Sequence, residues 1–340
     1  MPVTIKDVAR RAGVSPSTVS RVIAGSGVIS RATRERVAAV LKEMRYHPNA
    51  VARSLIRREA GIVGLSISRP ASDAFANAFF TEVIRGIGDE VGAAGLDLLL
   101  SMSATPQEEQ EHCLRLLRSR RIDGVIVSTA RVADDLLKTL DQEGFPAVVV
   151  GRPPAGTRMS WVNNDNVAAG RMATEHLVSL GHRHIGLISG AEELSFCRDR
   201  YRGYAMALSA AGLEPEPVAH VVHFTRQDGF DAARRLLRDR PRVSAVVAVD
   251  DTLATGALQA ARALGRRVPE DLSLVGFNDD PFAASLDPPL TTVRIQVYDM
   301  GRQAARILLR LVAGTAKLLR YRSAAELVVR ATTCPPGGPR

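Results

Sequence analysis

The chain has 340 residues, 46% of them hydrophobic, which is enough for two or three domains with ordinary cores. No apolar run approaches the roughly 18 residues of a membrane span, and charged residues near the N-terminus replace the apolar core of a secretory signal. These features favour a cytoplasmic protein. The cysteines stand singly at Cys113, Cys197 and Cys334, a spacing that argues against a disulfide framework and a zinc site.

The positive charge of the chain is concentrated at its N-terminus. Residues 1–60 contain 12 Lys and Arg against 4 Asp and Glu, a net charge of +8, whereas the whole chain carries +9. The other 280 residues are therefore nearly neutral. A basic segment ahead of a neutral body is the electrostatic pattern of a phosphate-binding head.

The first elements predicted are two short helices joined by a glycine turn. A helix should stop at Gly13, which can take positive φ, and Ser15 should cap a second helix that starts at Pro16. The polar face of this second helix would carry Ser17, Thr18 and Arg21. An ordinary helical hairpin has the same pattern, but the surrounding charge favours a helix-turn-helix that enters a DNA major groove.

A third helix and a short segment complete the basic region. After a glycine-rich loop at 24–29, Ser30 is predicted to cap a helix with an apolar stripe at Val37, Val40, Leu41 and Met44. The residue before a proline is disfavoured in a helix, which predicts an end ahead of position 48. Residues 49–55 contain helix formers but are too few for a stable isolated helix, so they should fold only against a partner.

Short apolar runs alternate with helical stretches in the remainder of the chain. Strands are predicted at 62–67, 96–100, 124–127, 147–150, 185–188, 218–224, 245–249, 272–276, 291–296 and 326–330. Helices are predicted at 82–91, 107–117, 168–180, 201–210, 229–237, 254–264 and 300–311. This alternation favours two halves of doubly wound parallel sheet, between which the chain crosses three times in a hinge suited to closing on a ligand.

Polar residues follow several of these apolar runs, where ligands of parallel sheets bind. They occur at 163–165, 189–190, 250–251 and 278–280, and Arg200, Phe79, Phe80 and Phe224 are expected to join them. Carboxylates, amides, a guanidinium and aromatic faces suit a polyhydroxylated ligand such as a sugar. An Asp after a strand is more often a turn or a helix cap, so the prediction depends on the residues converging.

The basic region resembles the DNA-binding head of the lactose-repressor family. The matching segments are Val3–Ala9, Gly13–Ser15, Thr18–Val22, Thr33–Val37, Tyr46–Asn49 and Ala52–Leu55. The resemblance implies DNA contacts by Thr4, Ser15, Pro16, Ser17, Thr18, Ser20, Arg21, Thr33, Tyr46, Asn49, Ala52, Arg53 and Leu55. It implies that Ser17 reads base edges and that Ala52 and Leu55 enter the minor groove as an apolar wedge. Ala24 departs from the family, which often has asparagine there.

The body resembles the periplasmic-binding-protein-like effector domain of the same family. The matching segments are Asn77–Phe80, Arg85–Ile87, Glu175–Leu177, Leu180–Ile185, Arg200–Tyr204, Val268–Asp271, Val275–Asp279 and Pro289–Val293. The resemblance implies effector contacts by Phe79, Asp165, Arg200, Phe224, Asp250 and Asn278. Many relatives have Asn-Asp where this chain has Asp250-Asp251, and Asp-Asp where it has Asn278-Asp279. This exchange of amide and carboxylate leaves the identity of the ligand open.

These observations predict an α/β protein with a small all-α helix-turn-helix head and a two-lobed body of doubly wound parallel sheets. The predicted domains are a head at 1–47, a hinge helix and linker at 48–60, an effector and dimerisation domain at 61–333, and a disordered tail at 334–340. Lobe 1 would comprise about 61–159 and 293–321, and lobe 2 about 160–292 and 322–333. The predicted partners are operator DNA, a small-molecule effector and a second copy of the chain, with no cofactor and no membrane.

The expected function is a homodimeric transcriptional regulator on a pseudo-palindromic operator, with repression relieved by a sugar. Activation, or corepression by a nucleobase-like ligand, stays open. A solute-binding protein would not need a basic head, and an enzyme would need a dinucleotide, phosphate-loop or nucleophile motif that the sequence lacks. His176, His182 and His184 have no convergent ligand pattern and are expected to be structural rather than metal-binding.

Overall fold

The computed structural model describes residues 3–23, 28–46, 59–128 and 131–337. It divides into two compact units, one formed by residues 1–62 with 120–123 and the other by the rest of the chain. None of the helices described is long and apolar enough to cross a lipid bilayer.

Three helices form the head: α1 (Ile5–Ala12), α2 (Pro16–Ile23) and α3 (Arg31–Glu43). Their small core consists of Val8, Ala9, Ala12, Val19, Val37 and Val40. Six small or medium apolar side chains bury little surface, so the exact helix ends contribute much of the stability of a domain of this size.

Local hydrogen bonds fix the ends of the head helices where the sequence predicts them. Gly13 has a φ of 65° and ends α1, while the Oγ of Ser15 accepts the Thr18 N–H at 3.2 Å and starts α2. Ser30 caps α3 by accepting the Thr33 N–H at 3.3 Å. Each cap satisfies a backbone donor that a helix start would otherwise leave free. The predicted turn between α1 and α2 is therefore confirmed.

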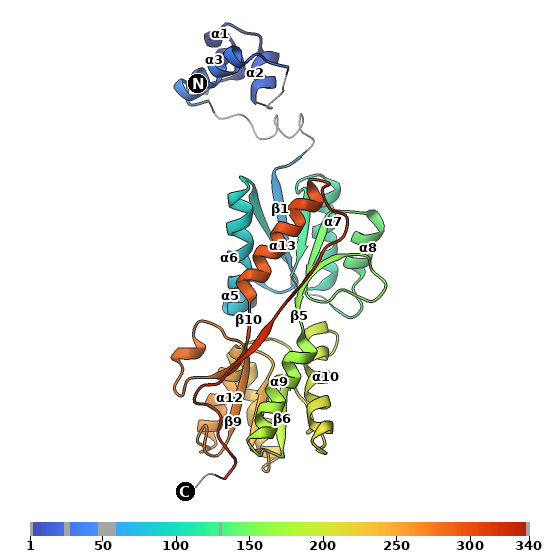
Figure 1. Ribbon diagram of the computed structural model, residues 1–340, viewed down its shortest axis with the longest axis vertical. Coiled ribbons are helices and arrows are strands. Elements are labelled where there is room, and N and C mark those ends of the chain that lie inside the picture. The colour runs from blue at the N-terminus through green and yellow to red at the C-terminus, as the bar shows by residue number, and fades with distance from the viewer. Residues whose placement is uncertain (1–2, 24–27, 47–58, 129–130, 338–340) are drawn as a thin grey trace. The chain divides into compact units, whose positions relative to one another are not determined.

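The first sheet of the body has the strand order β11-β5-β4-β3-β1-β2. Its strands are β1 (Ile62–Ile67), β2 (Asp97–Met102), β3 (Gly124–Val127), β4 (Ala147–Val150), β5 (Ser160–Asn164) and β11 (Arg320–Ser323). Helix α13 (Val297–Val312) lies against α6 (Ala78–Ala93), as Figure 1 shows. The pair α7 (Pro106–Arg118) and α8 (Asp135–Glu143) also pack together. Strands β3 and β4 are buried throughout, as strands covered on both faces must be.

The second sheet has the strand order β12-β10-β9-β8-β6-β7. Its strands are β6 (Ile185–Ser189), β7 (Ala219–His220), β8 (Ala245–Ala248), β9 (Ser273–Asn278), β10 (Thr291–Ile295) and β12 (Ala325–Val328), of which β12 runs antiparallel to β10. The flanking helices are α9 (Asn166–Ser179), α10 (Ser195–Ala210), α11 (Arg226–Asp239) and α12 (Asp251–Ala263). The prediction of two parallel α/β lobes is confirmed.

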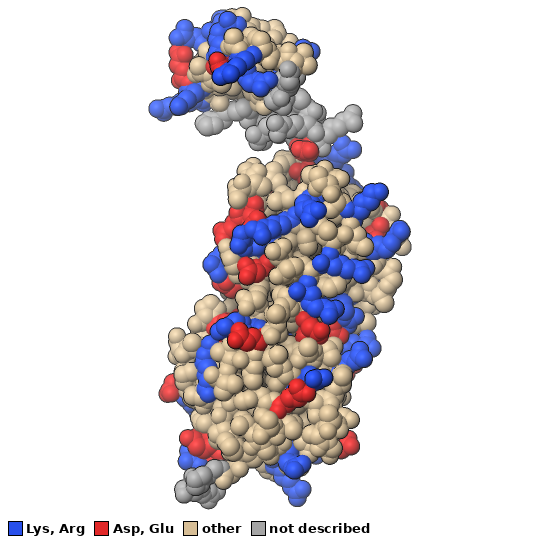
Figure 2. Space-filling view, in the orientation of Figure 1, with Lys and Arg blue, Asp and Glu red and all other residues tan. Residues whose placement is uncertain are grey.

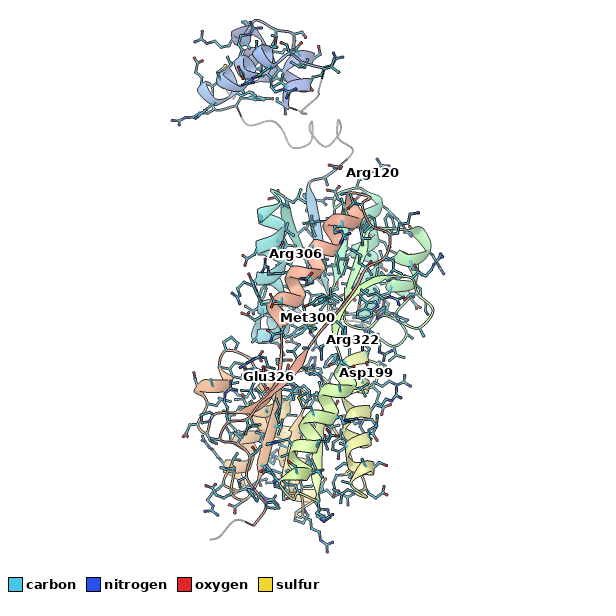
Figure 3. All side chains as sticks on the ribbon, viewed as in Figure 1. Arg120, Asp199, Met300, Arg306, Arg322 and Glu326 are labelled. Carbon is cyan, nitrogen blue, oxygen red and sulfur yellow. The ribbon has the colours of Figure 1, made fainter. Side chains whose placement is uncertain are left out.

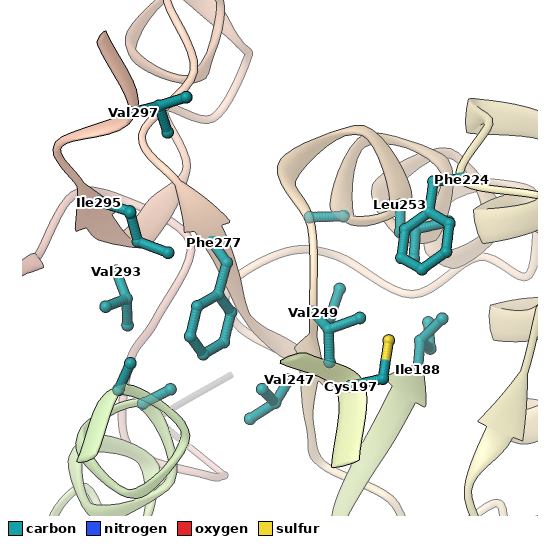
Figure 4. Packing of buried hydrophobic residues seen from close by; sticks show 14 of the residues in the cluster. Ile188, Cys197, Phe224, Val247, Val249, Leu253, Phe277, Val293, Ile295 and Val297 are labelled. Carbon is teal, nitrogen blue, oxygen red and sulfur yellow. The ribbon is translucent and has the colours of Figure 1, made fainter. Parts of the chain in front are cut away.

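Close helix contacts hold the second lobe together. A Cβ on Gly203 of α10 would come within 2.1 Å of the Val167 carbonyl oxygen, and one on Gly170 of α9 within 2.3 Å of the Arg200 carbonyl oxygen. Only glycine allows these backbones to approach so closely. Phe277 and Val249 are fully buried in the same lobe, at the ends of β9 and β8 (Figure 4). This packing fixes the ends of β8 and β9, next to which Asp250 and Asn278 lie.

Several predicted elements differ from the structure. Helices α5 (Ala71–Ala76) and α8 and strands β5 and β11 were not predicted. In β5, the polar residues Asn163 and Asn164 interrupt the apolar pattern. The predicted strand 218–224 is wrong beyond the two residues of β7. Val221 and Phe224 are buried from a loop, so the apolar run reflects burial rather than a strand.

The crossings between the sheets also fall a few residues from the predicted positions. Strand β5 belongs to the first sheet and β10 to the second, which places two crossings near 165 and 296, and the third lies near 324 between β11 and β12. The predicted disordered tail starts too early, because the Cys334 N–H donates to Ser273 Oγ at 3.0 Å. Residues 338–340 lie outside the described part of the chain.

Candidate functional site

Helix α2 presents a polar face at the surface of the head. Pro16, Ser17 and Arg21 are exposed, and Thr18 and Ser20 are partly exposed. Ser15 Oγ lies 2.8 Å from Ser17 Oγ and 2.9 Å from Thr18 Oγ1, so the three hydroxyls form one cluster at the helix start. This arrangement puts hydroxyl groups next to the positive end of the helix dipole, where phosphate oxygens bind well.

Arg21 is the basic residue of this face. The described residues offer it no hydrogen bond or ion pair, whereas Arg10 and Arg11 are paired with Asp7 and Glu43. Blue side chains outnumber red ones on the view of the head in Figure 2. An unpaired guanidinium near the start of an exposed helix can bind a guanine edge or a phosphate without first breaking an internal contact.

The other predicted DNA contacts fall into two groups. Thr4, Thr33 and Tyr46 are at least partly exposed, although Thr4 Oγ1 donates to Asp7 at 2.6 Å and Ser30 Oγ donates to Thr33 at 2.9 Å. The second group is the predicted DNA contacts of the hinge segment. They lie outside the described residues: Asn49, Ala52, Arg53 and Leu55.

The body contains a cavity between its two lobes. Residues from both sheets line it: Arg69, Asn77, Phe79, Phe80, Ser128, Val150, Gly151, Asn163, Asn164, Asn166, Ser195, Phe196, Arg200, Phe224, Asp250, Asn278 and Met300. Figure 3 marks Met300 where the chain passes from the second lobe into α13. The predicted residues Phe79, Arg200, Phe224, Asp250 and Asn278 thus share one cavity. Aromatic walls with a few charged and amide groups are typical of a small-molecule site.

Arg200 of α10 is fixed at the wall of this cavity. Its Nε donates to Asn166 Oδ1 at 2.9 Å, a second nitrogen donates to the Val249 carbonyl, and the guanidinium lies 4.3 Å from the Phe277 ring centroid. Burial lowers the pKa of Arg200 to about 10, so it stays charged at neutral pH. A charged group with neutral acceptors retains electrostatic attraction for a polar ligand.

Asp250 is the centre of a small amide–carboxylate cluster. Its Oδ2 accepts hydrogen bonds from Asn77 and Asn278, each at 3.2 Å, and its Oδ1 accepts the Thr252 N–H at 2.8 Å. Asn77 comes from the first lobe and Asp250 from the second, so this contact joins the lobes across the cavity. Asn278 has a φ of 106°, an uncommon backbone conformation of the kind found at functional sites.

Asp165 does not join the residues around the cavity. Its carboxylate caps α9 by accepting the Ala168 N–H at 3.0 Å and pairs with Arg322 at 3.3 Å. The neighbours Asn164 and Asn166 line the cavity instead, because the backbone turns from strand to helix at this point.

Arg152 and Asp199 form a second ion pair between the lobes at 2.8 Å, and Asp199 and Arg322 lie close to the crossing strands in Figure 3.

Behind the cavity lies a buried pair of carboxylates. Asp251 Oδ1 accepts the Thr292 hydroxyl at 2.7 Å, and its Oδ2 accepts the Asp280 N–H at 2.9 Å. Burial, with repulsion from nearby carboxylates, raises the pKa of Asp251 to about 8 and that of Asp280 to about 9. One Asp280 oxygen has no hydrogen-bond partner in the described structure. Both carboxyl groups therefore favour the protonated form more than an exposed aspartate does.

The sequence reasoning missed Arg69 and Asn77 as cavity residues. Arg69 follows β1 outside any segment that matches the family, and Asn77 is predicted only as part of the matching segment Asn77–Phe80. Asn77 could have been found as an N-cap, since its Oδ1 accepts the Phe79 N–H at 3.0 Å. No local pattern marks Arg69, because its position depends on how the loop folds back over the cavity.

The histidines at positions 176, 182 and 184 contact neighbouring protein groups. His182 contacts Ser244 Oγ and Ser273 Oγ, each at 2.9 Å, and His176 lies 3.0 Å from Thr333 Oγ1. His184 lies 3.0 Å from a carboxylate oxygen of Glu216. The part of the chain that the structure describes contains no group of three or more potential metal ligands. The His176 contact ties the C-terminal segment to α9.

Head and body together define a DNA-binding regulator with a ligand-binding domain. Residues 4–49 match the model of bacterial regulatory proteins of the lacI family, and residues 174–333 match that of a periplasmic binding protein-like domain. The HTH-type transcriptional regulator CelR of Thermobifida fusca is 38% identical over 96% of this chain and 97% of its own.

Solved structures agree with these matches. The transcriptional regulator CelR–cellobiose complex has a TM-score of 0.75 and 36% identity, covering 97% of this chain and 99% of its own. The lac repressor dimer bound to operator and the anti-inducer ONPF has a TM-score of 0.86 and 27% identity, covering 98% and 100%. The chain belongs to the lacI family of bacterial regulatory proteins and is a transcriptional regulator rather than an enzyme.

Proposed function

We propose that this protein is a cytoplasmic repressor that binds a pseudo-palindromic operator as a homodimer and responds to a sugar or sugar derivative in the body cavity. The main support for the effector site is the cavity lined by both lobes, in which Asn77 of one lobe contacts Asp250 of the other. A ligand that contacts both lobes can bind one arrangement of the lobes more tightly than another. It then shifts the equilibrium between the two arrangements, which is the basis of an allosteric response.

The proposed DNA-binding residues are those of the exposed α2 face, with Ser17 and Arg21 reading bases and the neighbouring hydroxyl groups contacting phosphates. The hydroxyl cluster supports this assignment, as does an exposed Arg21 to which the described residues offer no hydrogen bond or ion pair. The proposed hinge wedge rests on the sequence resemblance alone. Two identical heads related by a two-fold axis recognise a sequence with the same symmetry, and the solved lac repressor relative is described as a dimer on its operator.

A selection from random duplexes tests the DNA-binding half of the proposal. Full-length protein should enrich a two-fold symmetric sequence, and Arg21→Ala should lose the preference while keeping salt-sensitive binding to any duplex. Enrichment of an asymmetric half-site alone would contradict the dimer.

Thermal shifts test the effector half. A sugar that binds the native state should raise the melting temperature in proportion to RT ln(1 + [L]/Kd) and release the selected DNA. Arg200→Ala should remove both responses. A variant that remained fully responsive would place the effector site outside this cavity.

A further inference from the structure

Arg69 occupies the interior of the cavity. Its guanidinium lies 4.6 Å from the ring centroid of Phe224, in the second lobe, and 5.6 Å from that of Phe80, in the first. The side chain is largely buried, and the cavity that remains beside it has a volume of about 70 Å³. This space holds a few water molecules or one small ligand group. A larger ligand would have to lie directly against the Arg69 guanidinium.

The charge of Arg69 is poorly compensated. Its Nε is buried without a hydrogen-bond partner, and the described residues provide no ion pair to any of its nitrogens. Asp250 and Asp73 attract it from a distance, but both Asp250 oxygens already accept hydrogen bonds from Thr252, Asn77 and Asn278, and Asp73 lies 3.1 Å from His223. Burial outweighs this attraction and lowers the pKa of Arg69. A buried guanidinium without a direct anionic partner is costly for the ligand-free protein.

The neighbouring Arg131 shows what a structural arginine looks like in the same region. Its guanidinium donates to Ser68 Oγ at 2.7 Å and lies 3.5 Å from the buried carboxylate of Glu109. Arg131 thus compensates the buried carboxylate of Glu109, whereas Arg69 adds a positive charge that no nearby group pairs with in the described structure. Arg200, the other arginine of the cavity, also has hydrogen-bond acceptors for its Nε and one further nitrogen. Among these three arginines, Arg69 alone lacks an acceptor within the described structure.

We propose that Arg69 selects an effector that carries an anionic group, a carboxylate or a phosphate, and pairs with this group inside the cavity. The proposal rests on the effector site proposed above and specifies its ligand. The cavity lining contains two arginines against one carboxylate, so a ligand with one negative charge balances it. Oxyanions match the planar fork of a guanidinium, and the two phenylalanine rings would shield the ion pair from water.

Ligand-free stability provides the first test. Arg69→Met keeps the length and apolar contacts of the side chain but removes the buried charge, so its melting temperature should rise by several degrees. Arg131→Met is the matched control and should lower the melting temperature, because it leaves Glu109 without its cation. A fall for Arg69→Met equal to that of Arg131→Met would assign Arg69 a structural role and overturn the proposal, whether or not any probe binds.

Ligand binding provides the second test, with D-glucuronate, glucose 6-phosphate and D-glucose as probes at matched ionic strength. The wild-type protein should bind one anionic probe at least tenfold more tightly than D-glucose, and Arg69→Met should lose this difference. The two anionic probes distinguish a carboxylate from a phosphate. Binding of D-glucose to the wild type as tight as that of both anionic probes, abolished in Arg200→Ala, would overturn the proposal and leave the effector site intact. Binding that survives in Arg200→Ala would instead contradict the effector site itself.

Discussion

The α2 face of the head and the cavity of the body are both polar, but they hold their polar groups in opposite ways. In the head, Arg21 and the hydroxyl cluster lie at the surface, where water solvates them and a ligand replaces that water. In the body, Arg200 and Asp250 are buried and bonded within the protein. An exposed face can therefore change with little effect on folding, whereas the cavity residues contribute to stability and ligand binding together.

The largest effect that this comparison predicts is for Arg200→Ala. Loss of the guanidinium leaves the Val249 carbonyl without this buried donor and removes one of the two donors to Asn166 Oδ1, so the body should lose about 3 kcal/mol of unfolding free energy. Urea denaturation followed by circular dichroism measures this loss. A change below about 0.5 kcal/mol would mean that buried Arg200 is no more coupled to folding than a surface residue.

Arg21→Ala should affect binding but not folding. It removes an exposed side chain for which the described residues provide no hydrogen bond or ion pair, so operator affinity should fall by about 1–3 kcal/mol while the melting temperature stays the same. Fluorescence anisotropy on selected and scrambled duplexes measures the affinity. Arg11→Ala is a useful control, because Arg11 pairs with Glu43 at 2.7 Å and its loss should leave sequence preference unaltered.

The buried carboxylates Asp251 and Asp280 should make the stability of the body depend on pH. Because burial raises the pKa of Asp251 and Asp280, their contribution is fully present below about pH 4 and is lost as pH rises through 8 to 9. Asp280→Asn resembles the protonated acid, so its stability advantage over the wild type should grow as pH rises from about 4, where the unfolded carboxyl group begins to ionise, towards 9. Melting curves at five pH values would show this trend, and a constant difference would exclude titration as its cause.

The smallest expected effect is for Ser30→Ala in the head. Loss of the α3 cap leaves the Thr33 N–H without its side-chain acceptor and should destabilise the head by about 1 kcal/mol. Proton NMR of the head signals during thermal unfolding measures the change. Ser30→Asp should restore the cap, and a failure to restore stability would show that the hydroxyl has another role.

Much of the head was predictable from sequence because its structure is set by neighbours along the chain. Gly13 ends a helix, Ser15 and Ser30 start two others, and the apolar residues recur at helical spacing, so each signal lies within a few residues of its effect. The alternation of strands and helices in the body was equally local. The strand β5 was missed because its polar residues belong to the cavity, and site chemistry there overrides the pattern of a buried strand.

The amino-acid sequence by itself determined the family, the helix-turn-helix and the strand ends that carry Asp250 and Asn278. Only the tertiary structure decided that Asp165 caps a helix outside the cavity, while Asn77 crosses from the other lobe to reach Asp250. It also decided that Arg69 enters the cavity, between lobes whose aromatic residues are 144 positions apart in the chain. Local hydrogen bonds depend on short spacing and can be read from sequence, but burial and charge compensation depend on residues brought together only by folding.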